Sequence, residues 1–271
     1  MFSPLILIIG ATLFFFGAAI GSFLNLVIYR TQTGEQWVRG RSKCESCSHQ
    51  LSWFENIPIF SFILLRGKCR HCSAPLSISH VVVESMMGTL FLWWYAVGFL
   101  FFQLSQQPFT ILQPLFWLLV GILLLIIVVF DYKYMLIPDS ATIALLVLAL
   151  IYRVSLVLAG IMRPQDFFWT IAGMVLSVAF FYSLWYFTKG KGFGFGDVKL
   201  MAPLALLMGW PSLWVGIFLS TIVGSVVGIL MVVLGKAAFG KPIPFGPFLI
   251  LGTVLSLIWG DALITFYVTL I

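Results

Sequence analysis

The acid that most needs a chemical explanation is Asp197. It lies in the run Gly192-Phe-Gly-Phe-Gly-Asp197-Val-Lys199, in a chain of 271 residues that is 61% hydrophobic and has only 9 acidic residues. An Asp at the centre of a membrane helix costs about 2.5–3.5 kcal/mol on insertion scales. The glycines leave space for another backbone to approach the carboxylate. Asp197 is therefore a candidate catalytic acid, and Gly194 and Gly196 are candidate substrate-binding positions.

A second acid, Asp131, ends an uninterrupted apolar run that begins at Gly121. If Asp131 and Asp197 meet in a low-dielectric site, they cannot both ionise easily and would share a proton. One carboxylate could then act as a general base toward water while the other donates to a carbonyl, as in aspartic proteases. The alternative is that Asp131 and Asp139 are ordinary interfacial residues, with Asp139 capping the helix after Pro138. The sequence alone does not show that the two acids meet.

The four cysteines form two Cys-x-x-Cys pairs, which are a strong signature of a tetrahedral zinc site. Four thiolates would close the coordination shell, so we expect a structural metal that supplies folding energy to a short loop. Two disulfides are the alternative, which a cytoplasmic location disfavours. The predicted ligands are Cys44, Cys47, Cys69 and Cys72.

These residues must be positioned by membrane helices, because 9% charged residues among 61% hydrophobic ones is typical of a polytopic membrane protein. The chain has room for about eight spans of roughly 20 residues each. We predict an all-α protein with apolar segments at about 5–29, 80–102, 113–131, 140–161, 167–188, 198–209, 211–235 and 246–268. The segment 198–209 is short for a full span.

The basic residues predict the orientation. Of the 15 Lys and Arg residues, only Arg153 and Arg163 fall in connections on one side of this arrangement. The positive-inside rule therefore places the other side in the cytoplasm and both termini outside it. This distribution in short loops also argues against a nucleic-acid partner, despite the net charge of +6. We predict a first helix (1–29), a cytoplasmic zinc domain (30–79) and a membrane core (80–271).

In this order, several segments together resemble the bacterial prepilin peptidases, membrane aspartyl proteases with a Gly-x-Gly-Asp motif. The resemblance covers most of the chain. Glu55 stands where the family usually has Asp, and an Arg-Tyr-Pro segment often seen before Glu84 is absent, although Glu84 itself matches. The matching segments are Gly21-Ser-Phe-Leu-Asn25, Val27-Ile-Tyr-Arg30, the paired cysteines, Asn56-Ile-Pro58, Arg66-Gly-Lys-Cys-Arg70, Asp131 with Leu136-Ile-Pro-Asp139, Gly194-Phe-Gly-Asp197-Val-Lys199 and Pro244-Phe-Gly-Pro247.

The resemblance implies that Asp131 and Asp197 are the catalytic pair. It implies cleavage of type IV prepilins or type II secretion pseudopilins after a Gly that follows a basic leader, at the cytoplasmic face of the bacterial inner membrane. It also implies N-methylation of the new N-terminus with S-adenosylmethionine, an activity linked to the cysteine loop and its surroundings. Glu84 is carried over as a candidate substrate-binding residue.

Two other classes of protein remain as alternatives. An ion-coupled membrane transporter also uses membrane acids and glycine-broken helices, but it predicts repeat symmetry and acids near the midplane of the bilayer. A membrane scaffold organised by zinc explains the cysteines but not an Asp among glycines.

Overall fold

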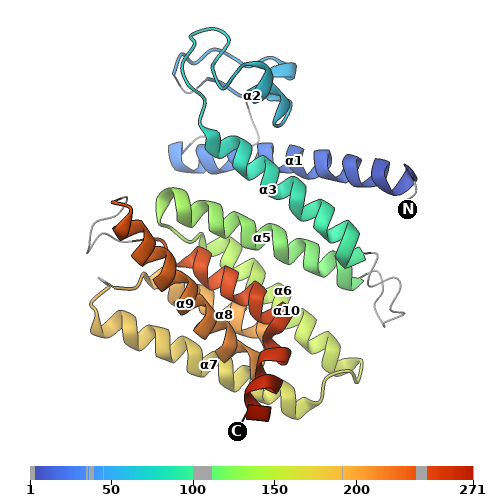
Figure 1. The fold of residues 1–271 in the computed structure, drawn as a ribbon, viewed down its shortest axis with the longest axis vertical. Coiled ribbons are helices and arrows are strands. Elements are labelled where there is room, and N and C mark those ends of the chain that lie inside the picture. Colours follow the sequence, from blue (N-terminus) through green and yellow to red (C-terminus); the bar gives the residue numbers. More distant parts are fainter. Residues whose placement is uncertain are drawn as a thin grey trace. The chain divides into compact units, whose positions relative to one another are not determined.

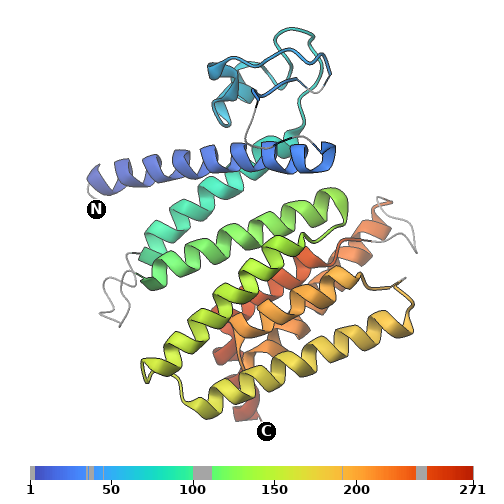
Figure 2. The ribbon, with the colours of Figure 1, turned by 180° about the vertical axis from the view of Figure 1, so that it is seen from behind.

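The computed structural model describes residues 4–34, 36, 40–44, 46–99, 112–190, 192–235 and 243–270. Helices make up most of this part of the chain (Figures 1 and 2), and the bridges outside named strands are Lys43 with Gln50 and Lys68 with Pro75. The prediction of an all-α protein with a small cysteine-containing domain is confirmed.

The chain divides into two compact units, residues 1–122 and 123–271, with the boundary inside helix α5 (Leu112–Tyr134). The first unit contains the cysteine loop, and the second contains both candidate catalytic acids. The three-part division expected from composition stays a prediction.

The first unit is built on two helices that pack closely through glycines. A Cβ on Gly17 would lie 2.7 Å from the Met87 carbonyl oxygen, and one on Gly21 would lie 2.8 Å from the Glu84 Cα. These close approaches hold α1 against α3, so the chain entering the cysteine loop starts beside the chain leaving it. The elements of this unit before α5 are α1 (Pro4–Thr33), η1 (Trp53–Asn56), α2 (Phe60–Leu64), α3 (Ile78–Trp93) and η2 (Trp94–Phe99).

The second unit surrounds one short helix with longer ones. Ten of the 14 residues of α8 are buried, and this helix contacts α6, α7, α9 and α10. A helix that is apolar on every side is stable only in such a core position. Besides the end of α5, the helices of this unit are α6 (Asp139–Leu158), α7 (Pro164–Phe187), α8 (Phe195–Met208), α9 (Ser212–Val233) and α10 (Gly246–Leu270).

The last turn of α8 is capped by an arginine from another helix. Because α8 is short, its C-terminal carbonyls end inside the bundle, where water cannot satisfy them. The Arg153 guanidinium of α6 donates to the carbonyl oxygens of Leu206 at 2.7 Å and Leu207 at 2.9 Å. A cation at a helix C-terminus also complements the helix dipole. Arg153 therefore closes the end of α8 that lies away from Asp197.

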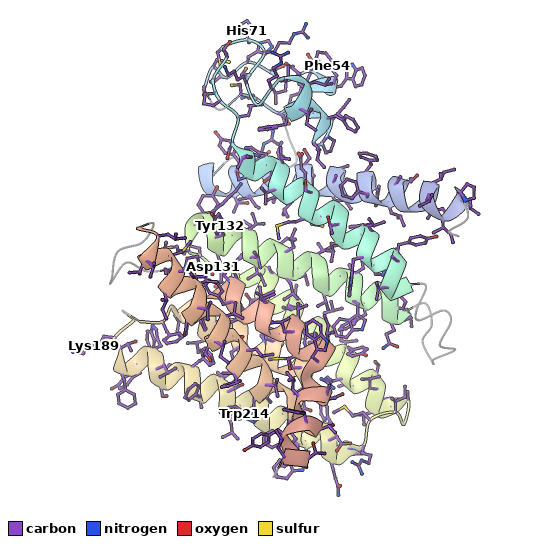
Figure 3. All side chains as sticks on the ribbon, viewed as in Figure 1. Phe54, His71, Asp131, Tyr132, Lys189 and Trp214 are labelled. Carbon is purple, nitrogen blue, oxygen red and sulfur yellow. The ribbon has the colours of Figure 1, made fainter. Side chains whose placement is uncertain are left out.

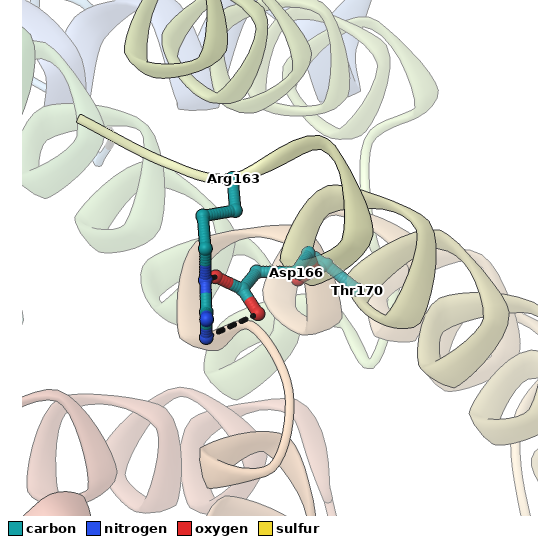
Figure 4. Close-up of polar contacts among 3 residues, drawn as sticks. All are labelled: Arg163, Asp166 and Thr170. Atoms are coloured by element: carbon teal, nitrogen blue, oxygen red, sulfur yellow. Dashed lines mark hydrogen bonds and ion pairs between the residues drawn. The ribbon is translucent and has the colours of Figure 1, made fainter. Parts of the chain in front are cut away.

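The N-terminus of α7 is formed by a local ion pair (Figure 4). Arg163 at the N-cap position donates to Asp166 at 3.0 Å, and the Thr170 hydroxyl donates to the Asp166 carbonyl oxygen at 2.8 Å. Pro164 occupies the first turn, where its missing N–H costs nothing. Thr170 also accepts from the Trp210 amide at 3.4 Å, so the connection after α8 is tied to α7.

Small residues bring α9 and α10 together. A Cβ on Gly252 would lie 2.6 Å from the Gly216 carbonyl oxygen, and the Ser256 hydroxyl donates to the Ser212 carbonyl oxygen at 2.6 Å. Such close approach of small residues is typical of helix pairs in membranes.

Six helices in the described ranges are long and apolar enough to cross a membrane, namely α1, α5, α6, α7, α9 and α10. The chain is therefore a multi-pass membrane protein. The other two expected spans correspond to α3 with η2 and to the short α8, so the total of about eight stays a prediction. The sidedness also stays a prediction. Residues 100–102 of the second expected span lie outside the described residues, and so do four of the basic residues used to predict the sidedness, namely Arg39, Lys191, Lys236 and Lys241.

Candidate functional site

Asp131 is buried near the end of α5 and is held by a helix N-terminus. Its side chain is only 5% exposed, and its Oδ2 accepts from the Gly246 backbone amide at 3.0 Å. Gly246 is the first residue of α10, where free amides and the helix dipole favour a negative charge. Figure 3 labels Asp131 at this end of α5. The helix then ends at Tyr134, and the next residue, Met135, has a φ of 53° that turns the chain toward α6.

Asp197 has a similar setting in the first turn of α8. It is 6% exposed, and its Oδ2 accepts from the Gly194 amide at 3.2 Å. This bond is that of an acid in a helical first turn reaching back to the residue before the helix. Gly194 thus lies directly against the carboxylate, and a Cβ there would be 3.4 Å from Oδ2.

The two carboxylates belong to one site. They are close enough to interact electrostatically, and they share a neighbour, Ile137, in the connection between α5 and α6. A Cβ on Gly196 would lie 3.1 Å from Ile137 Cβ, and one on Gly246 would lie 3.4 Å from Ile137 Cδ1 and 2.6 Å from Asp131 Oδ2. The second unit therefore brings together the ends of α5, α8 and α10, as the predicted pair requires.

Asp139 plays a different part from the cap considered as an alternative. Pro138 occupies the N-cap position of α6, and Asp139 instead accepts from the Lys199 ammonium at 2.7 Å. Both partners are partly exposed, 40% for the Lys199 side chain and 63% for the Asp139 side chain. The pair links the first turn of α6 to the second turn of α8. Asp139 is thus an exposed acid at this end of the bundle, whereas Asp131 and Asp197 are buried.

Glu84 is in the first unit, on α3, where it is 8% exposed and accepts from the Ile59 amide at 2.8 Å. Gly194 and Gly196 are in the second unit, beside Asp197. The three positions expected to contact substrate therefore do not form one group within a unit, and their role stays a prediction.

The four cysteines converge as expected. Their sulfur atoms all lie within 4.8 Å of one another, and Cys44 Sγ is 3.9 Å from Cys72 Sγ. Tetrahedral zinc with bonds of about 2.3 Å would separate the sulfurs by about 3.8 Å. All four are free thiols, so the disulfide alternative is wrong. The cluster fits a zinc ion by donor type and by spacing.

The cysteine loop is an internal repeat with a period of 25 residues. Each Cys-x-x-Cys pair forms a hook, the first at residues 43–50 and the second at residues 68–75. In the first hook the Cys44 amide donates to the His49 carbonyl at 2.9 Å, and in the second the Cys69 amide donates to the Ala74 carbonyl at 2.8 Å. In each hook a serine directly follows the second cysteine, and these serines, Ser48 and Ser73, have φ of 58° and 57°. The repeat was missed in the sequence because the hooks share few residue types outside their cysteines.

Backbone amides favour a thiolate in the first hook. The pKa of Cys44 is lowered to about 7, first by the amide of Cys47 and then by that of Ser46. The pKa of Cys47 is raised to about 11, because burial and the neighbouring thiols of Cys72 and Cys44 outweigh the lowering effect of the His49 amide. His49 and His71 stack on each other with centroids 4.5 Å apart, which accounts for both without a ligand role.

Sequence reasoning did not assign Gly246 and Ile137 to the site. Each lies in a segment recognised as characteristic, Pro244–Pro247 and Leu136–Asp139. Their roles depend on contacts between helices that are distant in sequence, so no local pattern reveals them.

Comparisons with known proteins agree with this arrangement. Residues 15–97 match the model of the bacterial Peptidase A24 N-terminal domain, and residues 118–229 match that of the type IV leader peptidase family. The first match falls within the first unit, and all but the first five residues of the second match fall within the second unit. No solved structure gives a significant match.

Several similar proteins carry the name prepilin leader peptidase/N-methyltransferase. The protein of Stutzerimonas stutzeri is 34% identical over 277 residues, which cover 93% of this chain and 91% of the relative. That of Aeromonas hydrophila is 31% identical over 285 residues, covering 94% and 92%. That of Legionella pneumophila is 30% identical over 279 residues, covering 93% and 92%. With both domain models matched in order and relatives aligned over nearly their whole length, the chain belongs to the type IV leader peptidase family.

Proposed function

We propose that this protein is an intramembrane aspartyl endopeptidase that removes the leader peptide from type IV prepilins or type II secretion pseudopilins at the cytoplasmic face of the bacterial inner membrane. It then methylates the new N-terminal amine. The observation that carries the peptidase activity is the pair of buried carboxylates, Asp131 and Asp197, each accepting an amide from a glycine at a helix N-terminus. The family membership and the names of the relatives support both activities.

The proposed cleavage uses the two acids in different protonation states. The ionised carboxylate takes a proton from water as the water oxygen attacks the scissile carbonyl carbon, and the protonated partner donates its proton to the carbonyl oxygen. The tetrahedral intermediate then collapses: the leaving amine takes up the proton held by the first acid, and a hydroxyl of the intermediate returns a proton to the second acid as the new carboxyl group forms. The repulsion between two nearby carboxylates favours the singly protonated pair that this chemistry needs.

Gly194 is the proposed clearance for substrate. A protease must bind its peptide in an extended form, because helical hydrogen bonds bury the scissile carbonyl. Gly194 offers a backbone without a side chain next to Asp197 Oδ2, whereas the space beside Gly196 is filled by Ile137. The proposed path of a peptide strand therefore runs beside Gly194, and Gly196 serves the packing of Ile137. An ion-coupled transporter is not favoured, because these acids lie at helix ends and no acidic midplane path is needed to explain them.

Two cofactors accompany the proposal. A structural zinc ion would be held by Cys44, Cys47, Cys69 and Cys72, whose thiols fit its geometry. S-adenosylmethionine, when bound, supplies the methyl group, as the amine nitrogen forms a bond to the methyl carbon, the sulfur–carbon bond breaks, adenosylhomocysteine leaves and the ammonium loses a proton.

The test is cleavage of a prepilin-type substrate by the purified protein in detergent. Asp131→Asn and Asp197→Asn should each abolish cleavage while the protein stays folded. Asp139→Asn is the matched control, because Asp139 lies at the same end of the bundle but is exposed and paired with Lys199. It should retain most of the activity. Full cleavage by either of the first two variants would exclude the proposed pair.

A further inference from the structure

One side of the segment that contains α2 is apolar and exposed. Its four side chains follow one another at helical spacing and together form what we call the α2 face. They are Ile57, Phe60, Ile63 and Leu64, with exposed fractions of 36%, 49%, 63% and 76%. The other side of the segment is polar, and Ser61 lines a polar cavity of about 310 Å³ between α1, α3 and the cysteine loop. A contiguous exposed apolar surface of this kind marks an interaction site.

A contact with α1 gives the position of the α2 face along that helix (Figures 1 and 2). The centroid of the Phe60 ring lies 5.6 Å from that of the Phe15 ring. α1 has 30 residues and is therefore about 45 Å long, so Phe15 lies about 17 Å from its start and about 27 Å from its end. A hydrocarbon core of about 30 Å that this helix crosses includes Phe15, wherever along α1 the core lies. Phe60 is therefore at the depth of the acyl chains.

Hydrogen bonds hold the segment at this depth. Ile59 begins α2 with a φ of 64°, a conformation that is rare for a β-branched residue, and its amide donates to Glu84 Oε2 on α3 at 2.8 Å. The amides of Ser61 and Ile63 donate to the carbonyl oxygens of Ile57 at 3.0 Å and Ile59 at 3.2 Å. Backbone groups among lipid chains need such internal partners. The segment is thus fixed beside α3 and suited to an apolar solvent.

The residues next to the α2 face suit the headgroup layer of a membrane. Arg66, Lys68 and Arg70 are all exposed and follow α2 directly. The Arg70 guanidinium lies 5.4 Å from the centroid of the Phe54 ring, which in turn packs edge-on against Trp53 at 5.9 Å. Trp is enriched at the level of the headgroups, and Lys and Arg are attracted to anionic lipids. An apolar face flanked by Trp and basic residues is typical of interfacial amphipathic segments.

We propose that the α2 face is embedded in the acyl chains of the bilayer that α1 crosses, and that Arg66, Lys68 and Arg70 contact anionic headgroups. Through the contact of Phe60 with Phe15, which is itself 45% exposed, the α2 face continues the lipid-facing surface of α1. The cysteine loop is then anchored to the membrane by its own apolar segment as well as by the two helices at its ends. The proposal depends on neither the peptidase nor the methyltransferase function.

Photolabelling from within the bilayer tests the proposal on the unmodified protein. The full chain is placed in nanodiscs of phosphatidylethanolamine and phosphatidylglycerol that contain a lipid with a diazirine on its acyl chain, and labelled residues are located by peptide mapping. Ile8 of α1 is the matched reference, because Ile8 and Ile63 are both 63% exposed. Ile63 should be labelled as strongly as Ile8, and residues 46–50 of the first hook should stay at background. Background labelling of Ile63 would overturn the proposal.

Charge reversal tests the basic residues, and the repeat of 25 residues supplies a matched control. Arg66→Glu with Lys68→Glu changes the second hook and the turn before it, whereas Arg41→Glu with Lys43→Glu changes the equivalent positions of the first. In the wild type, replacing phosphatidylglycerol by phosphatidylcholine should lower the labelling of Ile63 by about threefold or more. The first-hook variant should respond in the same way, and the second-hook variant should be labelled weakly in both lipids. Equal lipid dependence of all three proteins would overturn the headgroup contacts.

Other occupants of the α2 face give different results in the same assay. If a substrate helix binds there, adding a prepilin-type substrate should lower the labelling of Ile63. If a second copy of the chain binds there, nanodiscs that hold two copies should give less labelling than those that hold one. A fall in either case would overturn lipid as the occupant, and unchanged labelling in both would support it. A protein that is labelled as expected but cleaves no prepilin would keep the anchor and count against the peptidase.

Discussion

At the scale of single residues, the proposed catalytic role of Asp131 depends on its hydrogen bond from the Gly246 backbone amide. Gly246 donates its backbone N–H to Asp131 and leaves no room for a methyl group, because a built Cβ would lie 2.6 Å from Asp131 Oδ2. The carboxylate has to shift if this glycine gains a side chain.

We therefore predict that Gly246→Ala lowers the rate of prepilin cleavage by about 10²-fold, the effect of a misplacement near 1 Å in an active site. The control is Gly228→Ala on α9, where a built Cβ meets only Ile243 Cδ1, at 4.0 Å. Single-turnover cleavage in detergent compares the two. Equal activity of both variants would contradict the role of Gly246.

The serines of the two hooks lead to a prediction of increased stability. Ser48 and Ser73 adopt left-handed conformations, which cost a residue with a Cβ about 1–2 kcal/mol and cost glycine almost nothing. Glycine also raises the conformational entropy of the unfolded chain, which reduces the expected gain in stability. The double variant Ser48→Gly, Ser73→Gly should stabilise the folded loop by up to about 1 kcal/mol.

The measurement is the chelator concentration that removes half of the bound zinc, which should rise in the double variant. Ser46→Gly is the control in the same hook, because Ser46 has no left-handed conformation to relieve. Its zinc should be lost at an equal or lower chelator concentration. A double variant that follows this control would show that the serines are unstrained.

At the scale of helices, α8 is the element on which the site depends. Its first turn carries Asp197, and its last carbonyls are capped by Arg153. Replacing Arg153 by Met keeps an unbranched apolar stem, removes the guanidinium and leaves two buried carbonyl oxygens without this donor. Each such orphan costs about 1–3 kcal/mol.

We expect Arg153→Met to lower the thermal unfolding temperature in detergent clearly, whereas Arg163→Met should change it little. Arg163 is the matched control because it is exposed and pairs only locally with Asp166, an interaction that is worth little in water. Comparable losses in both variants would mean that the cap does not stabilise α8.

This cap also shows where prediction from sequence reaches its limit. The Cys-x-x-Cys pairs and the acid among glycines are local patterns that the sequence displays directly. The structure brings the four cysteines together, and the catalytic role of Asp197 stays a prediction. Arg153 was interpreted only as a residue that sets topology, because its two acceptors lie more than 50 positions away, on α8. The amide donor of Asp131 is 115 positions away. Contacts of this kind follow from helix packing, which no single pattern in the sequence encodes.

At the scale of the whole molecule, the two units hold different groups of candidate functional residues. The carboxylate pair and its glycine donors lie within residues 123–271, and the cysteine cluster and the polar cavity lie within residues 1–122. Cleavage creates the amine that is then methylated, so one protein can carry out both steps in sequence. Zinc should matter more for the second step, because the family resemblance links methylation to the cysteine loop, whose four cysteines are the candidate metal ligands.

We therefore predict that removing zinc lowers methylation far more than cleavage. A loop this short buries little apolar surface, so metal binding supplies much of its folding free energy, and the fold of the loop is lost with the metal. The measurement is mass spectrometry of the product, which reports cleavage and methyl gain in the same sample. Chelator-treated protein and a Cys69→Ser variant should both give cleaved, unmethylated product, and returning zinc should restore methylation only to the chelated wild type. If cleavage falls as steeply as methylation, the carboxylate pair depends on the zinc-bearing loop, and the two units do not act as separate sites.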